Sequence, residues 1–488
     1  MFDQYAFIPR PAKHFIGGEF VSSADQKYFA TINPATGTVL TEVALGGEAE
    51  INAAVAAAKA AAAQYEWREM PRGRRVELLR AIANGIENRL RDLAILETLD
   101  TGKPLGETIN GDIPRAARNF RYFADLLSNE RCETFCGDDG SRHTVKREPL
   151  GVVGLITPWN LPLYLATWKA APALAQGNAI VLKPAEWTPL TATLLGEIMR
   201  DAGVPPGVFN VVHGFGPGGA GEALVRHADV RAISFTGETG TGRAIMGAAA
   251  AGLKKISFEL GGKGSSVVFP DADLDEAAKT VVHAAFRNQG QICLAGSRLI
   301  VHESVEREFS LKVLEHVRKI RIGDPLDEAT TMGSLIHETH AQRVEGYVNH
   351  ARQTGGTILA GGQRPPHSKG AFFEPTVIAG VAQDSRLIQE EIFGPVLTVQ
   401  TFHDLDEALA LVNGTPYGLS TSVWSQNAAT TQKFAEGART GLVWINSWFL
   451  RHLGTAFGGM KQSGIGREGG HHSFDFYAEL KTVSERRY

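Results

Sequence analysis

Cys293 is the residue of this sequence with the clearest potential for nucleophilic chemistry. It ends the segment Asn288-Gln-Gly-Gln-Ile-Cys293, which is polar and bounded by glycines. A lone cysteine is more often an inert small hydrophobic residue, but these flanks favour a thiol held in a polar turn. The other cysteines, Cys132 and Cys136, have the spacing C-x-x-x-C without matched histidines. Because that spacing makes a poor metal site, we expect no metal.

Two further side chains could assist such a nucleophile. Glu259 closes the apolar segment 255–259, and a carboxylate at the end of a buried strand can be a desolvated general base. A partner in an ion pair is the commoner role for such a residue. Asn160 stands between Pro158 and Pro162, which stiffen the loop, and a fixed amide N–H suits an oxyanion. A simple turn asparagine would fit the same pattern.

Several glycine-rich segments could bind a nucleotide. The spacing G-x-G-x-x-G begins at Gly214, at Gly216 and at Gly464, and each match is weak because the chain is rich in glycine. Residues 234–242 instead run from an apolar strand into a helix start, where free N–H groups attract phosphate. Lys183 and Glu186 follow another expected strand, at the strand end where open α/β sheets bind ligands. Solvated loop charges are the alternative for this pair.

The elements that must position these residues alternate between strands and helices. Strands are expected over residues 151–157, 179–183, 208–213, 232–236 and 255–259, with helices over 189–202, 221–227 and 240–251. This alternation predicts a doubly wound parallel sheet. A second series follows a break near residues 261–264, with strands over 265–269 and 298–302 and helices over 274–286, 304–321 and 406–413. Helices are also expected over 51–64 and 72–98, and the polar residues 129–147 are typical of a protruding hairpin.

Composition bounds the class of protein. The chain has 488 residues, 49 basic and 53 acidic side chains, and a formal net charge of −4, which is unlike the basic footprint of a nucleic-acid binder. Three cysteines cannot form a disulfide framework and fit a reducing compartment. We find neither a secretory signal pattern nor an apolar run of membrane-spanning length, and we expect a cytoplasmic protein. Glycine contributes 54 residues, above the usual share of about 7%, which indicates close approaches between the backbone and a ligand.

Taken together, the ordered motifs resemble the NAD(P)-dependent aldehyde dehydrogenase superfamily over nearly the whole chain. The motifs are Thr157-Pro-Trp-Asn160, Lys183-Pro-Ala-Glu186, Phe235-Thr-Gly237, Phe258-Glu-Leu-Gly-Gly262, Gly290-Gln-Ile-Cys293, Glu390-Glu-Ile-Phe-Gly-Pro395 and Phe457-Gly-Gly459. The resemblance implies oxidation of an aldehyde to a carboxylic acid. Cys293 would be the nucleophile, Asn160 an oxyanion donor and Glu259 the base that activates water to hydrolyse a thioester.

The resemblance also implies the cofactor and the residues that bind it. NAD would lie against Thr157, Pro158, Trp159, Lys183, Glu186, Gly237, Gly242, Leu260, Glu391 and Phe393. The carboxylate of Glu186 beside the ribose would repel a 2′-phosphate, which favours NAD over NADP. Glu238 stands where many relatives have serine, so its relation to the pyrophosphate stays open. A cysteine hydrolase is a distant alternative, because no motif places a histidine base beside Cys293.

Two arginines suggest the substrate. Arg115 and Arg451, in Asp112-Ile-Pro-Arg115 and Asn446-Ser-Trp-Phe-Leu-Arg451, resemble the branch of the family that oxidises 2-hydroxymuconic and 2-aminomuconic semialdehydes. Their planar guanidinium groups suit a substrate carboxylate, although ion pairs within the protein would fit equally well, and Arg118 could substitute for Arg115. We therefore expect a carboxylated aldehyde from aromatic ring cleavage. Betaine aldehyde or a simple aliphatic or aromatic aldehyde is the alternative.

The architecture implied by the resemblance has three parts. A Rossmann-like NAD-binding domain would comprise residues 1–127 and 148–260, and an α/β catalytic domain would comprise 261–470. Residues 128–147 and 471–488 would form a β-hairpin oligomerisation arm. The resemblance implies a homodimer or a homotetramer, with no nucleic acid or membrane as a partner.

Overall fold

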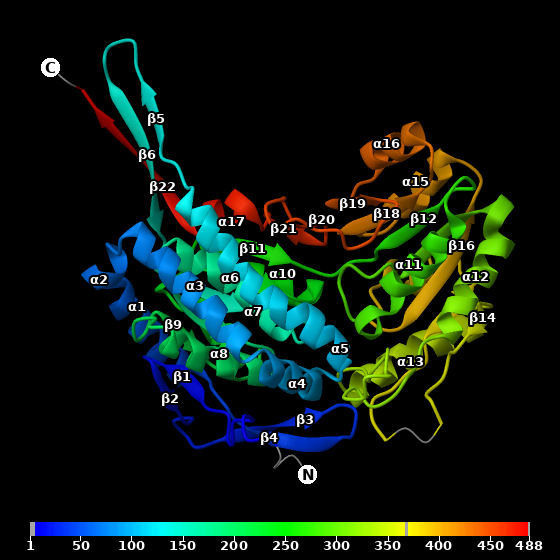
Figure 1. The fold of residues 1–488 in the computed structure, drawn as a ribbon, viewed down its shortest axis with the longest axis horizontal. Coiled ribbons are helices and arrows are strands. Elements are labelled where there is room, and N and C mark those ends of the chain that lie inside the picture. The colour runs from blue at the N-terminus through cyan, green and yellow to red at the C-terminus, as the bar shows by residue number, and fades with distance from the viewer. Residues whose placement is uncertain (1–4, 367–368, 487–488) are drawn as a thin grey trace.

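Two separate β-sheets with helices on their faces make up most of the protein (Figure 1). A computed structural model describes residues 5–366 and 369–486. Residues 1–4 of the expected NAD-binding domain and 487–488 of the expected arm lie outside the described residues. The α/β fold class predicted from the alternating pattern is confirmed by both sheets.

The first sheet has eight strands in the order β2-β1-β9-β8-β7-β10-β11-β21. Its centre is parallel, and antiparallel strands close both edges. The bounds are β1 His14–Ile16, β2 Glu19–Val21, β7 Val152–Ile156, β8 Ala179–Lys183, β9 Phe209–Val211, β10 Val230–Thr236, β11 Lys255–Glu259 and β21 Gly464–Ile465.

Helices cover both faces of this sheet, which explains why its strands are apolar throughout. Alternate residues of β7 and β8 pack to opposite sides, with Val152 and Val181 on one side and Val153 and Ile180 on the other. The first side is covered by α1 Glu48–Ala63, α9 Ala220–Arg226 and α10 Thr239–Ala250. The second side is covered by α3 Arg72–Asn88, α4 Leu90–Thr101, α6 Ile113–Ser128, α7 Pro162–Ala175 and α8 Leu190–Asp201.

The second sheet has seven strands in the order β14-β15-β16-β13-β12-β18-β19, parallel except for β14 at one edge. The strand bounds are β12 Ser265–Val268, β13 Arg298–His302, β14 Thr357–Ala360, β15 Thr376–Ala379, β16 Val396–Phe402, β18 Ser420–Trp424 and β19 Leu442–Ile445. The accompanying helices are α11 Leu274–Phe286, α12 Glu306–Arg318, α13 Glu338–Gln353, α14 Arg386–Gln389, α15 Leu405–Asn413 and α16 Ala428–Gly437.

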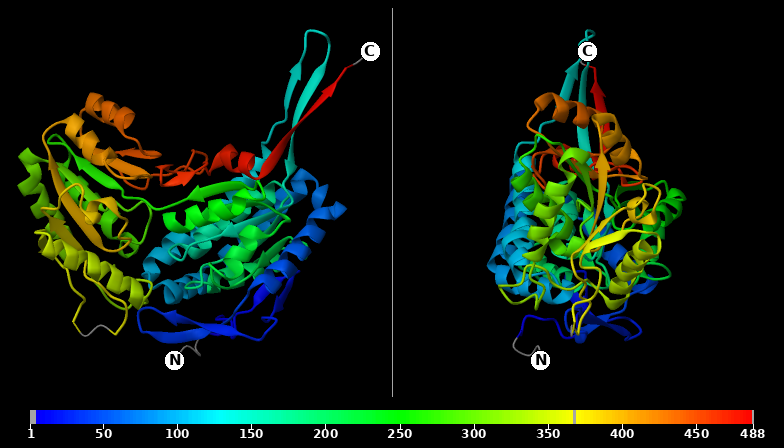
Figure 2. Two further views of the ribbon diagram at one scale, coloured as in Figure 1. Left: turned by 180° about the vertical axis from the view of Figure 1, so that it is seen from behind. Right: turned by 90° about the vertical axis from the view of Figure 1, so that its right-hand side faces the viewer.

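A three-stranded sheet projects from the body, as both views in Figure 2 and the view in Figure 1 show. It joins β5 Glu133–Cys136 and β6 Arg142–Pro149 to the C-terminal strand β22 Ala478–Glu485, which pairs with β6 along its whole length. The expected hairpin at 128–147 is therefore shifted, because α6 continues to Ser128 and β6 continues to Pro149. The expected tail begins in α17 Gly470–Phe476 before it becomes a strand.

Several elements differ from the sequence prediction. The helix expected over 72–98 is two helices, because the backbone of Arg89 leaves the helical region (φ −109°, ψ 19°). An apolar period cannot show such a break, since both helices bury one face. The helix expected over 304–321 begins with a short 3₁₀ turn, Glu303–Val305, and ends at Arg318.

Several elements given above were not predicted, namely α6, α7, α13, α14, α16, α17, β1, β2, β14, β15, β16, β18, β19 and β21. Nor were the short elements β3 Tyr28–Asn33, β4 Thr38–Ala44, α2 Tyr65–Arg68, α5 Leu105–Glu107, the π-helical turn Thr108–Asp112, the 3₁₀ turn Arg287–Gly290, β17 Tyr417–Gly418 and β20 Met460–Lys461.

Candidate active site

The site lies where the chain crosses from one sheet to the other, between β11 and β12. Glu259 ends β11, and Gly261 and Gly262 follow it in an extended link of buried residues. A Cβ on Gly262 would lie 2.3 Å from the Cys293 carbonyl oxygen, and a Cβ on Gly261 would lie 2.4 Å from Glu391 Oε2. Glycine at both positions therefore lets the link touch the nucleophile loop and a third carboxylate at once.

Cys293 sits in a turn between α11 and β13, partly exposed, against the apolar side chains of Trp444 and Phe457. Burial of the Cys293 thiol raises its pKa to about 12, and the negative charges of Glu391 and Glu259 raise it further. Arg451 acts in the opposite direction and lowers the pKa of Cys293. The thiol of the protein without ligands is therefore protonated at neutral pH.

The residues before Cys293 adopt an uncommon backbone. Asn288, Gln289 and Gly290 have consecutive positive φ values of 48°, 57° and 69°. A Cβ on Gly290 would lie 2.2 Å from the Gly394 carbonyl oxygen, so only glycine fits there. Such conformations persist when surrounding contacts hold them, and they concentrate at functional sites.

The amide of Asn160 is directed at this loop. Asn160 is buried, two residues before the start of α7, and its Nδ2 donates to the Gln291 carbonyl oxygen over 2.8 Å. An amide nitrogen carries two N–H groups, and this bond uses one of them. The structure thus brings the predicted amide donor beside the chain that leads into Cys293.

Glu259 is an isolated, buried carboxylate. Neither of its oxygens has a hydrogen-bond partner among the described residues. Burial, followed by the negative charge of Glu468, raises the pKa of Glu259 well above its ordinary value, while Lys169 and Arg451 lower it. A buried carboxyl group without hydrogen bonds and with a raised pKa is suited to accept and release a proton.

A cleft of about 420 Å³ lies at the carboxyl ends of β7, β8 and β10. Its wall includes six of the predicted cofactor residues, namely Thr157, Pro158, Trp159, Lys183, Glu186 and Gly237. Lys183 is buried and donates to Glu186 Oε2 over 3.2 Å, and burial lowers the pKa of its ammonium group. Since Lys has three N–H donors and this bond uses one, the pair can hold ribose hydroxyls. The residues present therefore fit a nucleotide.

Two further predicted cofactor residues, Glu391 and Phe393, lie on a neighbouring loop. Glu391 Oε1 accepts a hydrogen bond from the Gly262 N–H over 2.8 Å, and burial raises the pKa of Glu391 to about 7. Phe393, at φ 58°, meets the Trp159 ring edge-on with 5.2 Å between the centroids. The loop is thereby joined both to the link after β11 and to the cleft.

Gly242, Leu260 and Glu238 complete the expected cofactor region. A Cβ on Gly242 would lie 2.7 Å from Leu260 Cδ2, so this glycine lets α10 pack against the link after β11. Neither Gly242 nor Leu260 is part of the cleft wall, whereas Glu238 is. Glu238 immediately precedes α10, and no cap hydrogen bond involves its side chain.

The two predicted substrate arginines converge on the same aromatic side chains. The guanidinium of Arg115 lies 4.9 Å from the Tyr164 ring and 5.6 Å from the Trp168 ring. Arg451 lies 4.6 Å from the Trp168 ring and 3.8 Å from the Phe457 ring, and its Nη1 donates to the Tyr164 hydroxyl over 3.3 Å. Within the described chain neither arginine forms an ion pair, and Nη2 of each is buried without a partner.

Arg115 also lines a second cavity of about 260 Å³. The cavity wall includes Leu161 and Ile292, the chain neighbours of Asn160 and Cys293, together with Arg118 at the surface. Arg451 is not part of this wall. The cavity therefore lies next to the chain segments of Asn160 and Cys293, and its wall shares no residue with the nucleotide cleft.

Sequence reasoning missed a buried ion pair behind Glu259. Lys169 Nζ donates to Glu468 Oε1 over 2.7 Å and to Ser234 Oγ over 2.9 Å. Trp168 Nε1 donates to the other oxygen of Glu468. The one signal in the sequence was a lysine inside the otherwise apolar segment of α7.

Comparison with known proteins gives the class. The model of the aldehyde dehydrogenase family matches residues 20–483. The chain is 48% identical over 480 residues to a 2-hydroxymuconic semialdehyde dehydrogenase of Pseudomonas sp. (strain CF600), covering 96% of this chain and 98% of that one. It is 46% identical over 484 residues to a 2-aminomuconic 6-semialdehyde dehydrogenase of Pseudomonas sp., covering 97% and 98%. A solved NAD+ complex of an aldehyde dehydrogenase from Bacillus cereus superposes with a TM-score of 0.96 at 40% identity, covering 98% and 97%.

The chain belongs to the aldehyde dehydrogenase family. The family resemblance seen in the motifs is thus confirmed, and with it the reaction class, NAD-dependent oxidation of an aldehyde. In the described part of the chain no helix is long and apolar enough to cross a membrane.

Proposed function

We propose that this aldehyde dehydrogenase oxidises a semialdehyde that carries a carboxylate, of the kind produced by aromatic ring cleavage. The observation that carries the proposal is the pair Arg115 and Arg451, each with a buried, unpartnered Nη2. A buried guanidinium without an anionic partner is costly, and a substrate carboxylate would supply that partner. The relatives whose names are semialdehyde dehydrogenases support the same substrate class.

Cys293 is the proposed nucleophile. The thiol gives its proton to solvent water, the thiolate sulfur adds to the aldehyde carbon, and the carbonyl oxygen becomes an oxyanion. The free N–H of the Asn160 amide and the backbone N–H of Cys293 stabilise that oxyanion. Each such donor contributes about 3 kcal/mol, because it meets charge that develops only as the bond forms.

Oxidation of the thiohemiacetal leaves a thioester on Cys293. Bound NAD supplies the hydride acceptor for this step. Thr157, Pro158, Trp159, Lys183, Glu186 and Gly237 line its proposed cleft, Glu391 and Phe393 lie on the adjoining loop, and Gly242 and Leu260 pack beneath it. The carboxylate of Glu186 accepts hydrogen bonds from ribose hydroxyls and repels a 2′-phosphate, which favours NAD over NADP.

Glu259 is the proposed base for hydrolysis of the thioester. Its unpartnered oxygens can take a proton from water as the water attacks the thioester carbon, which releases the carboxylic acid and returns the thiol. Its raised pKa makes the carboxylate of Glu259 a stronger base than an ordinary carboxylate. General base catalysis of this kind is worth about 10²- to 10⁴-fold.

We propose that the chain divides into two domains and an arm. Residues 1–127 and 148–260 form the NAD-binding domain and 261–470 the catalytic domain, with 128–147 and 471–488 as an oligomerisation arm. The projecting β22–β6–β5 sheet supports the arm, since its exposed Phe135 and Leu480 would be covered in a homodimer or homotetramer. The small number of cysteines supports a cytoplasmic location.

A screen of NADH formation tests the substrate. We expect the highest kcat/KM with carboxylated semialdehydes, and lower values with aliphatic, aromatic and betaine aldehydes. A preference for betaine aldehyde or a simple aldehyde would refute the proposal in favour of the alternative. Turnover without NAD, lost on alkylation of Cys293, would instead indicate a cysteine hydrolase.

A further inference from the structure

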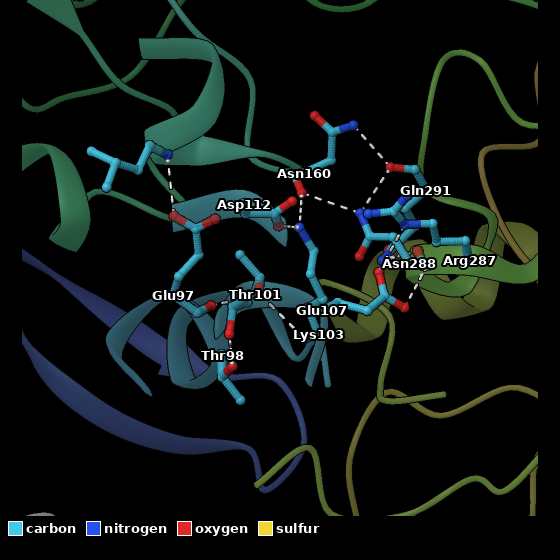
Figure 3. A network of polar contacts seen from close by, with 12 residues as sticks. Glu97, Thr98, Thr101, Lys103, Glu107, Asp112, Asn160, Arg287, Asn288 and Gln291 are labelled. Carbon is cyan, nitrogen blue, oxygen red and sulfur yellow. Dashed lines mark hydrogen bonds and ion pairs between the residues drawn. The ribbon is translucent and has the colours of Figure 1, made fainter. Parts of the chain in front are cut away.

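A buried network of charged and amide side chains lies beneath Asn160 and the nucleophile loop (Figure 3). At its centre is Lys103, which is 1% exposed. Its Nζ donates to Asp112 Oδ2 and, over 3.0 Å, to the main-chain carbonyl of Asn160. A buried ammonium group thus binds the main chain of Asn160, whose side chain is the proposed oxyanion donor.

A second donor reaches the same carbonyl from the nucleophile loop. Asn288 Nδ2 donates to the Asn160 carbonyl oxygen over 3.1 Å and to the Gln291 carbonyl oxygen over 3.1 Å. The side chain of Asn160 donates to that same Gln291 oxygen. The two chain segments are therefore joined by two hydrogen bonds, and a third joins Asn288 to Gln291 within the nucleophile loop. The Asn160 carbonyl is held from two directions, by Lys103 and by Asn288.

The segment that carries Lys103 also supports the left-handed loop. Glu107 Oε1 accepts a hydrogen bond from the Asn288 N–H over 3.3 Å, and Oε2 of the same residue pairs with Arg287 over 3.5 Å. Asp112 ends the π-helical turn Thr108–Asp112, a rare element that is frequent at functional sites. Residues 103–112 therefore contact both the segment of Asn160 and the loop of Asn288, and Glu107 and Asp112 also line the cavity of about 260 Å³ beside them.

We propose that Lys103 is a positioning residue that acts through Asn160. With its carbonyl held by Lys103 and Asn288, the loop of Asn160 is fixed so that one amide N–H binds Gln291 and the other faces the oxyanion. This inference rests on the role proposed for Asn160. Replacing both members of a buried ion pair by uncharged residues of similar volume is often nearly neutral for stability, so we expect the effect of replacing Lys103 and Asp112 together to fall on the rate.

A double-mutant cycle tests the inference. Lys103→Met is combined with Asp112→Asn, so that no unpaired carboxylate is left buried. This double variant is measured in the wild-type protein and in the Asn160→Ala variant. Because small misplacements of a catalytic group cost up to about 10²-fold, we expect the pair to lower kcat/KM about 10- to 100-fold when Asn160 is present. In the Asn160→Ala background the further loss should be at most about 2-fold, since the donor to be positioned is gone.

Two readouts separate positioning from a structural role. The KM for NAD and the rate of Cys293 alkylation should stay unchanged in the Lys103→Met/Asp112→Asn variant, because neither depends on the amide of Asn160. Arg89→Met is the matched control, since it breaks an ion pair with Glu197 that does not touch Asn160; it should lower Tm and leave kcat/KM unchanged.

Each result decides one question. Equal losses with and without Asn160→Ala would refute the action of Lys103 through Asn160. If Asn160→Ala alone leaves kcat/KM unchanged, the proposed role of Asn160 fails, and the inference fails with it. If the Lys103→Met/Asp112→Asn variant does not fold, Lys103 is structural and the inference is refuted.

Discussion

Replacement of Arg115 by glutamine is the sharpest test of the substrate proposal. Arg115 is half-buried on α6, its Nε donates to Asn119 Oδ1 over 3.0 Å, and its Nη2 has no partner among the described residues. Burial lowers the pKa of its guanidinium to about 10, so the group is still charged at neutral pH. The amide of glutamine is long enough to keep the hydrogen bond to Asn119. It lacks the positive charge and the planar, forked arrangement of N–H groups that arginine has.

The expected size of the effect follows from the bonds lost. A hydrogen bond to a charged group contributes about 1.5–3 kcal/mol, and about 1.4 kcal/mol corresponds to a factor of ten in rate. Arg115→Gln should therefore lower kcat/KM for a carboxylated semialdehyde about 10- to 150-fold. For a neutral aldehyde of the same length we expect a change of less than about 3-fold, because Arg115 is not among the groups that shift the pKa of Cys293 or Glu259.

The assay is steady-state NADH formation with the two aldehydes at saturating NAD. Arg121→Gln is the matched control, because Arg121 lies on the same helix but pairs with Glu87 at the surface; both substrates should be unaffected. Equal losses with the carboxylated and the neutral aldehyde in Arg115→Gln would refute the reasoning, since they would show that Arg115 acts on the structure of the site and not on the carboxylate.

Three further outcomes are expected. Glu259→Gln should retain a burst of NADH but slow the steady state about 10²- to 10⁴-fold, as rapid-mixing absorbance would measure; loss of the burst itself would contradict its role in hydrolysis. Glu186→Ala should raise the NADP/NAD ratio of kcat/KM about five- to tenfold by removing a like charge, and an unchanged ratio would locate the selectivity elsewhere. Burial raises the pKa of Glu97 from 4.5 to about 8. Between these two values the folded protein keeps a proton on Glu97 that the unfolded chain releases, so the free energy of unfolding of the wild type falls as pH rises. The Tm of Glu97→Gln relative to wild type should therefore increase between about pH 5 and about pH 8, and a constant difference would contradict the raised pKa.

Residue patterns predicted the strands that carry the site but not the edges of the sheets. Strands such as β8 are apolar on both faces because helices cover both sides, and this leaves a strong signal. The edge strands β1 and β21 have three and two residues, too few for a periodic pattern. β21 also lies more than 200 positions from its partner β11 along the chain, and local sequence contains no information about such a pairing.

The individual site residues were visible to local reasoning only as weak candidates. Glu259 at a strand end and Asn160 between prolines had ordinary alternatives, and only their order in the family motifs favoured the proposed roles. Lys103 gave no signal, because its partners, Asp112 and the carbonyl of Asn160, are 9 and 57 positions away. Buried polar networks depend on which segments meet in space, so tertiary structure is needed to find them.

If Arg451 binds a substrate carboxylate as proposed, we expect substrate binding to change the pKa of Cys293 and of Glu259. Its positive charge lowers the pKa of both Cys293 and Glu259, while burial and nearby carboxylates raise both. A substrate carboxylate bound to Arg451 would neutralise part of that charge, and the pKa values of the two groups would rise. A carboxylate shared with Arg115 would neutralise less of the charge of Arg451, because the two arginines carry two positive charges against one negative charge. We therefore expect Arg451, rather than Arg115, to limit the rise in the pKa of Cys293 and Glu259 while a carboxylated substrate is bound.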